Sequence, residues 1–231
     1  MLIRIIYLII IIIMIYIVLV LFCYKNICSV FDREYLKNET VEQLRQLTMH
    51  IVCKKKIQFP ISKYIYLNDK ICGAYTNSTL LLAPSTSIYQ IILDLDILKD
   101  NFYGFKVHRG ALTAYEELKP QLMSIYPQTV AGYSIGAMIS ILYAYDVWKQ
   151  KGIKVALFLI GAPPIGNKKF KKEFDSIFRS VTYTNHKLDA LAEPMMDQEL
   201  FSYYHIGKKN TKYNFITDGL CRKFIPHIRY F

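Results

Sequence analysis

The feature that most constrains this fold is the pentapeptide G-Y-S-I-G of residues 132–136, which separates two apolar runs. Residues 129–133 predict a short buried strand, and residues 134–149 predict an apolar helix. Small residues on both sides of a serine at such a junction are typical of a strained strand-to-helix turn, because bulky neighbours would clash there. The turn would project the Ser134 hydroxyl above the edge of a sheet. We therefore interpret Ser134 as a nucleophile rather than as an incidental serine in an ordinary turn.

Strands and helices alternate along the rest of the chain, which implies parallel strand pairing. The expected fold is α/β, with a mainly parallel central sheet and helices on both faces. At 231 residues the chain is long enough for one such domain, which we assign to residues 26–231. The other predicted strands are residues 64–67, 71–75, 79–83, 105–108, 155–160 and 178–184, and the other predicted helices are residues 31–51, 111–126 and 168–177.

The N-terminal segment predicts a membrane anchor. Residues 5–24 are almost all apolar, and about 20 residues of helix span the hydrocarbon core of a bilayer. The run is long for a signal peptide and is followed by no small-residue cleavage site, so residues 1–25 predict an uncleaved signal-anchor helix. A cleaved signal peptide, which would give a secreted protein, is the alternative. The sequons at Asn38 and Asn77 favour a lumenal or extracellular catalytic domain on a single-pass membrane protein.

The net charge of +11 indicates which classes of binding partner to expect. A basic surface is attracted to anionic lipid headgroups. The lysine runs are scattered and form no nucleic-acid-binding motif, so a nucleic-acid partner is not expected. The five cysteines form no C-x-x-C pair, and we expect no metal and no cofactor. Cys53 and Cys72 are one pair available for a disulfide in an oxidising compartment.

A nucleophilic serine needs a base, and the base needs a carboxylate to orient it. Asp189 follows a predicted strand and would lie at the carboxyl edge of the sheet, whereas Asp146 and Asp175 lie in predicted helices and are expected to be surface charges. Two histidines remain as candidates for the base. His227 lies in the C-terminal segment, and His205 lies in an apparent strand where a structural role is expected.

Five segments match the motifs of one enzyme family in the right order. Residues 107–111 (V-H-R-G-A), 132–137 (G-Y-S-I-G-A), 161–167 (G-A-P-P-I-G-N), 184–189 (T-N-H-K-L-D) and 226–231 (P-H-I-R-Y-F) resemble segments of the class 3, or fungal-type, triacylglycerol lipases. The resemblance runs from about residue 64 to the last residue. It implies an α/β-hydrolase fold in which Ser134, Asp189 and His227 form the catalytic triad.

The resemblance also implies an oxyanion hole. In the family, R-G-[ST] follows the central strand, and its hydroxyl residue supplies the second donor. Here Thr86 is expected in that role, beside the N–H of Ile135, although Pro84 and Ser85 replace the arginine and the glycine. The proline removes one backbone donor and stiffens the loop.

A lid and a reaction follow from the same resemblance. The stretch that matches the family's lid helix contains Ile88, Tyr89, Ile91 and Ile92, and it is either a mobile lid or a core helix. The implied reaction is hydrolysis of a lipid ester through an acyl-enzyme. A phospholipase A1 and a monoacylglycerol lipase are alternatives, and a catalytically inactive lipid-binding protein on the same fold is an alternative of another class.

Overall fold

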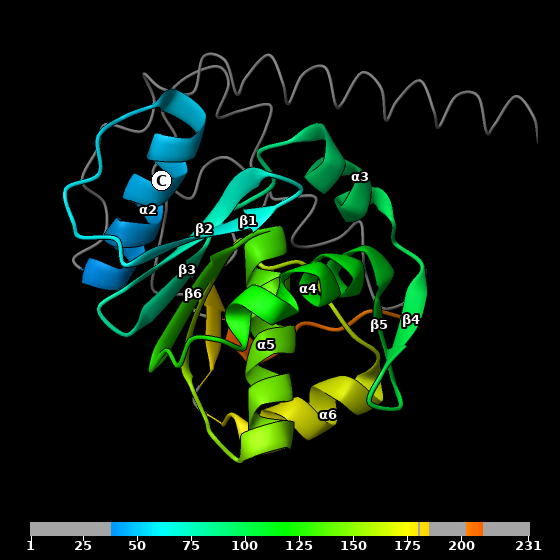
Figure 1. The fold of residues 1–231 in the computed structure, drawn as a ribbon. Coiled ribbons are helices and arrows are strands. Elements are labelled where there is room, and N and C mark those ends of the chain that lie inside the picture. Colours follow the sequence, from blue (N-terminus) through cyan, green and yellow to red (C-terminus); the bar gives the residue numbers. More distant parts are fainter. Residues whose placement is uncertain (1–37, 180, 185–201, 210–231) are drawn as a thin grey trace, which may run out of the picture.

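The fold is built around a seven-stranded mixed sheet in the order β1-β2-β3-β6-β7-β8-β9 (Figure 1). The computed structural model describes residues 38–179, 181–184 and 202–209. Strands β1, β2 and β3 are antiparallel, and β3, β6, β7, β8 and β9 are parallel. The prediction of a mainly parallel sheet is confirmed for the strands from β3 to β9. The strands are β1 (Lys63–Leu67), β2 (Lys70–Thr76), β3 (Thr79–Leu82), β6 (Thr129–Tyr133), β7 (Ala156–Ile160), β8 (Thr182–Thr184) and β9 (Lys208–Lys209).

Helices cover both faces of the sheet, as predicted (Figure 1). Helix α2 (Glu39–Cys53) packs on one face against β2, β3 and β6, while α4 (Arg109–Leu122) and α5 (Ile135–Lys151) pack on the other face. The alternation of side chains along β3 supplies both cores, because Leu80 and Leu82 belong to the larger core and Leu81 belongs to the core under α2. Two further helices, α3 (Ile88–Leu95) and α6 (Lys168–Ile177), flank the α4–α5 side.

Helix α2 has clear capping signals at both ends. The Asn38 side chain accepts a hydrogen bond from the N–H of Val41 at 3.2 Å, which is a typical N-cap. Lys54 closes the C-terminus in the left-handed conformation, with φ of 58°. Of the predicted helix of residues 31–51, the first seven residues lie outside the described part of the chain, and the helix continues two residues beyond the predicted end.

The interpretation of Asp146 as a surface charge is wrong. This residue of α5 is fully buried and receives hydrogen bonds from Tyr103 (2.5 Å), Tyr115 and Gln150 (2.6 Å) and an ion pair from Lys119 (2.9 Å). Tyr103 lies in the turn of a separate hairpin of β4 (Lys99–Phe102) and β5 (Phe105–His108). The carboxylate therefore joins this hairpin and α4 to α5.

The two described cysteines do not pair with each other. Cys72 is a buried free thiol whose pKa is raised to about 12 by burial, whereas Cys53 is disulfide-bonded. The possible Cys53–Cys72 disulfide is therefore excluded.

Within residues 38–179, 181–184 and 202–209, no helix is long and apolar enough to cross a membrane. The predicted anchor of residues 1–25 lies outside the described residues and stays a prediction.

Candidate active site

Ser134 occupies a strained turn between β6 and α5, as the sequence predicts. Its backbone has φ of 59° and ψ of −123°, a combination that side-chain-bearing residues rarely adopt. The Ser134 N–H donates to the carbonyl oxygen of Ile160, the last residue of β7, at 3.0 Å. The turn is therefore fixed to the carboxyl edge of the parallel strands, the edge at which open α/β sheets bind ligands.

The glycines on both sides of Ser134 are required by close backbone contacts. A Cβ at Gly132 would lie 2.3 Å from the Gly136 carbonyl oxygen and 2.4 Å from the hydroxyl oxygen of Ser140. A Cβ at Gly136 would lie 2.3 Å from the Leu82 carbonyl oxygen. These distances are far below van der Waals contact, so the pentapeptide is a steric requirement of this turn.

The same contact places the predicted oxyanion loop, residues 83–86, beside the first turn of α5. A Cβ at Gly136 would also lie 2.6 Å from the Ala83 carbonyl oxygen, so the loop begins directly against the helix N-terminus. Ile135 is the first residue of α5, and the first N–H groups of an α-helix have no partner within the helix. The positive end of the helix dipole adds to the attraction for an anion. Ile135 thus stays the predicted donor on the helix side.

Thr86 is not available as the second donor in this structure. Its N–H donates to the side-chain oxygen Oε1 of Gln90 at 2.6 Å, and its hydroxyl lies 3.2 Å from the same oxygen. Gln90 belongs to α3 and is 1% exposed. The prediction for Thr86 therefore fails in this arrangement, because an amide held by Gln90 cannot also stabilise an oxyanion.

Ser85 is the residue of this loop that sequence reasoning missed. It is buried, and its hydroxyl donates to the carboxylate of Asp94 near the end of α3. Asp94 and Gln90 are one helical turn apart, so one face of α3 holds two consecutive residues of the loop. The signal for Gln90 was present in the sequence, because S-I-Y-Q of residues 87–90 fits the S-x-x-[EQ] capping box that the structure contains.

The other two members of the predicted triad, Asp189 and His227, lie outside the described residues, and their roles stay predictions. His205 is described, and its ring stacks on Tyr183 with centroids 4.6 Å apart. His108 is fully buried, and its Nδ1 accepts a hydrogen bond from the Ala111 N–H at 3.1 Å. Burial lowers the pKa of His108 to about 4, so its imidazole is neutral near pH 7. His108 is thus a helix cap rather than a proton carrier.

Helix α3 presents an apolar face to solvent. Ile88 is 67% exposed and Ile92 is 58% exposed, and Leu95 and Leu98 continue the exposed surface. The alternative of a core helix is therefore wrong for Ile88 and Ile92, while Tyr89 and Ile91 are half-buried. Whether α3 moves as a lid stays a prediction.

A cleft of about 930 Å³ is lined by residues of α3, of the C-terminal end of α2 and of the β1–β2 turn. Ile51, Ile71 and Ile91 contribute apolar walls, and Lys54 and Lys70 contribute cations. Asp69 contributes one carboxylate, and Ser85 and Thr86 of the oxyanion loop also line the cleft. The lining therefore combines apolar side chains, which suit an acyl chain, with charged side chains, which suit a polar head group.

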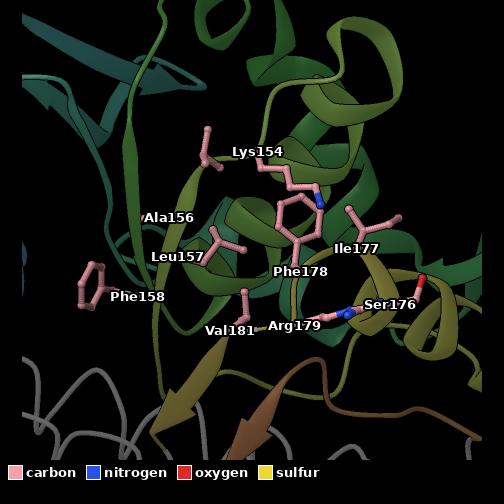
Figure 2. Close-up of a pocket in the computed structure, with 10 residues that line it drawn as sticks. Lys154, Ala156, Leu157, Phe158, Ser176, Ile177, Phe178, Arg179 and Val181 are labelled. Atoms are coloured by element: carbon pink, nitrogen blue, oxygen red, sulfur yellow. The ribbon is translucent and has the colours of Figure 1, made fainter.

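Figure 2 shows a second cavity, of about 670 Å³. It is formed where β7 begins and α6 ends, which is the opposite edge of the parallel sheet. Figure 2 shows Lys154 above the Phe178 ring and Arg179 below it, with the apolar side chains of Leu157 and Val181 beside them. Ser134, the one member of the predicted triad that the structure describes, does not line it. Among the described residues there is also no cluster of three or more side chains suited to hold a metal ion.

Comparison with known proteins agrees with this geometry. The sequence profile of the family described as Lipase (class 3) matches residues 81–198, slightly more than half of the chain. The match includes the oxyanion loop, Ser134 and Asp189. A lipase of Rhizopus niveus is 25% identical over 118 residues, covering 45% of this chain and 30% of the relative. Phospholipase A1-Igamma1 of Arabidopsis thaliana, a chloroplastic protein, is 30% identical over 128 residues, covering 48% of this chain and 24% of the relative.

The solved structure of the Rhizomucor miehei triacylglyceride lipase has a similar fold. The two chains superimpose with a TM-score of 0.57 at 21% identity, and the match covers 76% of this chain and 81% of the other. The curated relatives, in contrast, are matched over less than a third of their own length. The structural likeness therefore concerns the fold.

Proposed function

The chain belongs to the class 3 lipase family, and from that premise we propose that it is a serine hydrolase that cleaves carboxylic esters of lipids. The observation that carries the proposal is the backbone of Ser134, which is strained, enclosed by two obligatory glycines and located at a helix N-terminus. Strain of this kind persists where the surrounding structure enforces it, and it is concentrated at functional sites. An ordinary turn would not need it.

The proposed reaction is acyl transfer to Ser134 followed by hydrolysis. His227 takes the proton from the Ser134 hydroxyl as the oxygen attacks the ester carbon, and Asp189 holds the imidazole in the required tautomer. The alcohol leaves with the proton from His227, and a water molecule then attacks the acyl-enzyme and releases the fatty acid. The backbone N–H groups of Ile135 and Ser85 stabilise the oxyanion, where one donor is worth about 3 kcal/mol of barrier.

Labelling with a fluorophosphonate tests the proposal directly, because only an activated serine reacts quickly with this probe. The full chain in detergent should be labelled at Ser134 and should hydrolyse a soluble p-nitrophenyl ester. The catalytically inactive alternative predicts neither result.

We further propose that the exposed apolar face of α3 contacts the lipid surface. Replacing Ile88 and Ile92 together by serine should lower the rate on an emulsified triglyceride by about tenfold. Full burial of the two isoleucine side chains in lipid would contribute about 3 kcal/mol of binding free energy, and contact with a lipid surface buries them only in part. The rate on the soluble ester should change by less than about threefold. Ile153→Ser is the matched control, since Ile153 is 46% exposed and lies just after the far end of α5. Equal losses on both substrates would contradict a role at the lipid surface.

The location proposed for this domain is a lumenal or extracellular membrane surface, with residues 1–25 as the anchor. The disulfide at Cys53 supports this location, because disulfides persist in oxidising compartments. The apolar length of the N-terminal segment supports the anchor.

A phospholipid substrate is a second candidate, favoured by the cleft beside α3. Lys54 and Lys70 are both exposed and line this cleft together with isoleucine side chains, an arrangement suited to a phosphate head and the start of an acyl chain. Lys54 is held there in a left-handed backbone conformation that glycine normally adopts at a helix C-terminus.

The double variant Lys54→Ala with Lys70→Ala tests this candidate. We expect about a 30-fold lower rate on phosphatidylglycerol vesicles and little change on emulsified triglyceride, because each of the two lysines contributes roughly 1 kcal/mol at an anionic surface. Lys151→Ala with Lys154→Ala, two exposed lysines at the opposite edge, is the control. If both double variants lower the vesicle rate equally, the cleft is not specific and net charge alone explains the effect.

A further inference from the structure

One buried oxygen joins the predicted lid helix to the oxyanion loop. Oε1 of Gln90 accepts hydrogen bonds from the Thr86 N–H at 2.6 Å and from the Ser87 N–H at 3.2 Å, and the Thr86 hydroxyl lies 3.2 Å away. A carbonyl oxygen has two lone pairs, so the N–H groups of Thr86 and Ser87 together occupy the acceptor capacity of this oxygen. Because Gln90 is 1% exposed, water cannot replace these bonds.

The helix that carries Gln90 is itself in close contact with the start of α4. A Cβ at Gly110 would lie 1.7 Å from the Leu93 carbonyl oxygen, so the backbones of α3 and α4 are in direct contact. Arg109 of α4 also forms an ion pair with Asp96 at 2.7 Å, directly after α3. The contacts with α4 therefore fix the position of α3, and the hydrogen bonds of Gln90 fix the loop relative to α3.

We infer that Gln90 is a positioning residue for catalysis, in that its side-chain oxygen sets the geometry of the oxyanion loop. The inference rests on the proposed function. Gln90 binds the Thr86 N–H and so fixes the loop residue directly after Ser85, whose own hydroxyl is bound to Asp94. Oxyanion donors act by being held in place before the reaction, and a displacement of about 1 Å can cost roughly 100-fold in rate. Loss of Gln90 should therefore affect the chemical step more than substrate binding.

A purely structural reading is that Gln90 only caps α3. The capping box has two halves, and the second is the Ser87 hydroxyl, which accepts a hydrogen bond from the Gln90 N–H at 3.3 Å. Ser87→Ala removes this half and weakens the helix without removing the acceptor of Thr86. Ser87→Ala is thus a matched control for the capping effect.

The experiment compares Gln90→Met, Gln90→Glu and Ser87→Ala in the full chain, with the soluble p-nitrophenyl ester as substrate. Gln90→Met keeps the length of the side chain but has no strong acceptor, so we expect kcat to fall by about 10- to 100-fold with KM changed less than threefold. Gln90→Glu keeps an acceptor oxygen and should recover kcat to within about fivefold of wild type. Ser87→Ala should keep kcat within about threefold, and amide exchange at Thr86 should accelerate in Gln90→Met.

The outcomes separate the inference from the proposed function. Equal losses of kcat in Gln90→Met and Ser87→Ala, or a change in thermal stability alone, would overturn the role of Gln90 while leaving an active enzyme. A wild-type chain that hydrolyses no ester and is not labelled at Ser134 would overturn the proposed function and the inference with it. Recovery by Gln90→Glu together with a near-normal Ser87→Ala supports the inference.

Discussion

Ser134→Ala should lower kcat for a p-nitrophenyl ester by roughly 10⁴-fold or more and abolish fluorophosphonate labelling. Removal of the nucleophile of a serine triad leaves only the contribution of the oxyanion hole and of substrate binding. The substitution is small, because the side chain loses one oxygen and the backbone of Ser134 is already held by its N–H bond to Ile160. Circular dichroism and the melting temperature should therefore change little, and the loss should be purely chemical.

Ser140→Ala is the matched control for this experiment. Ser140 is a buried serine of the same helix, and its hydroxyl donates to the Gly136 carbonyl oxygen at 2.7 Å. The variant should still react with the probe at Ser134. If Ser134→Ala retained more than about a tenth of the wild-type rate, or if the probe labelled another serine, the proposed nucleophile would be wrong.

Much of the fold follows from local patterns in the sequence. The prediction for residues 129–133 matches β6, that for residues 168–177 matches α6, and that for residues 155–160 differs from β7 by one residue. These segments have strong periodicity or end at glycine and proline, so their limits are set locally. Strand β4 was missed because its sequence, K-D-N-F, has no apolar alternation, and it forms only by pairing with β5.

The site shows the same division between local and long-range information. The turn at Ser134 could be predicted, because the two glycines and the adjoining strand and helix are contiguous in sequence. The sequence predicts Thr86 as the second oxyanion donor, but in this arrangement its N–H is bound by Gln90, and the choice between Thr86 and Ser85 depends on Gln90 and Asp94 of the following helix. Asp189 and His227 lie outside the described residues, so the triad beyond Ser134 rests on the sequence.

Asp146 also shows where sequence reasoning failed. It lies in α5, whose residues are buried on every side from Ile135 to Val147. A helix that is apolar all round is a buried helix, so a single carboxylate within it was itself a sign of a buried, paired charge.

Asp146→Asn should lower the free energy of unfolding by about 2–4 kcal/mol at pH 7. The uncharged amide has one acceptor oxygen and presents an NH₂ group to donors, so one or more of Tyr103, Tyr115 and Lys119 loses its partner in a buried site. Urea unfolding followed by circular dichroism measures the change. Glu116→Gln is the control, because Glu116 is half exposed and lies 3.8 Å from the same lysine, and it should cost less than about 0.5 kcal/mol.

The difference between wild type and Asp146→Asn should depend on pH in a defined direction. Burial by itself would raise the pKa of Asp146, but the hydrogen bonds from Tyr103, Tyr115, Lys119 and Gln150 outweigh it and lower the pKa below its ordinary value of 3.8. A carboxyl with a lowered folded-state pKa stabilises the fold fully above its unfolded-state value, and this contribution is lost as the pH falls through the folded-state pKa. The difference should therefore be constant from pH 5 to 7 and shrink below about pH 4. A difference that grew on acidification would show that Asp146 is protonated in the folded protein, and the ion pair with Lys119 would then not hold α4 to α5.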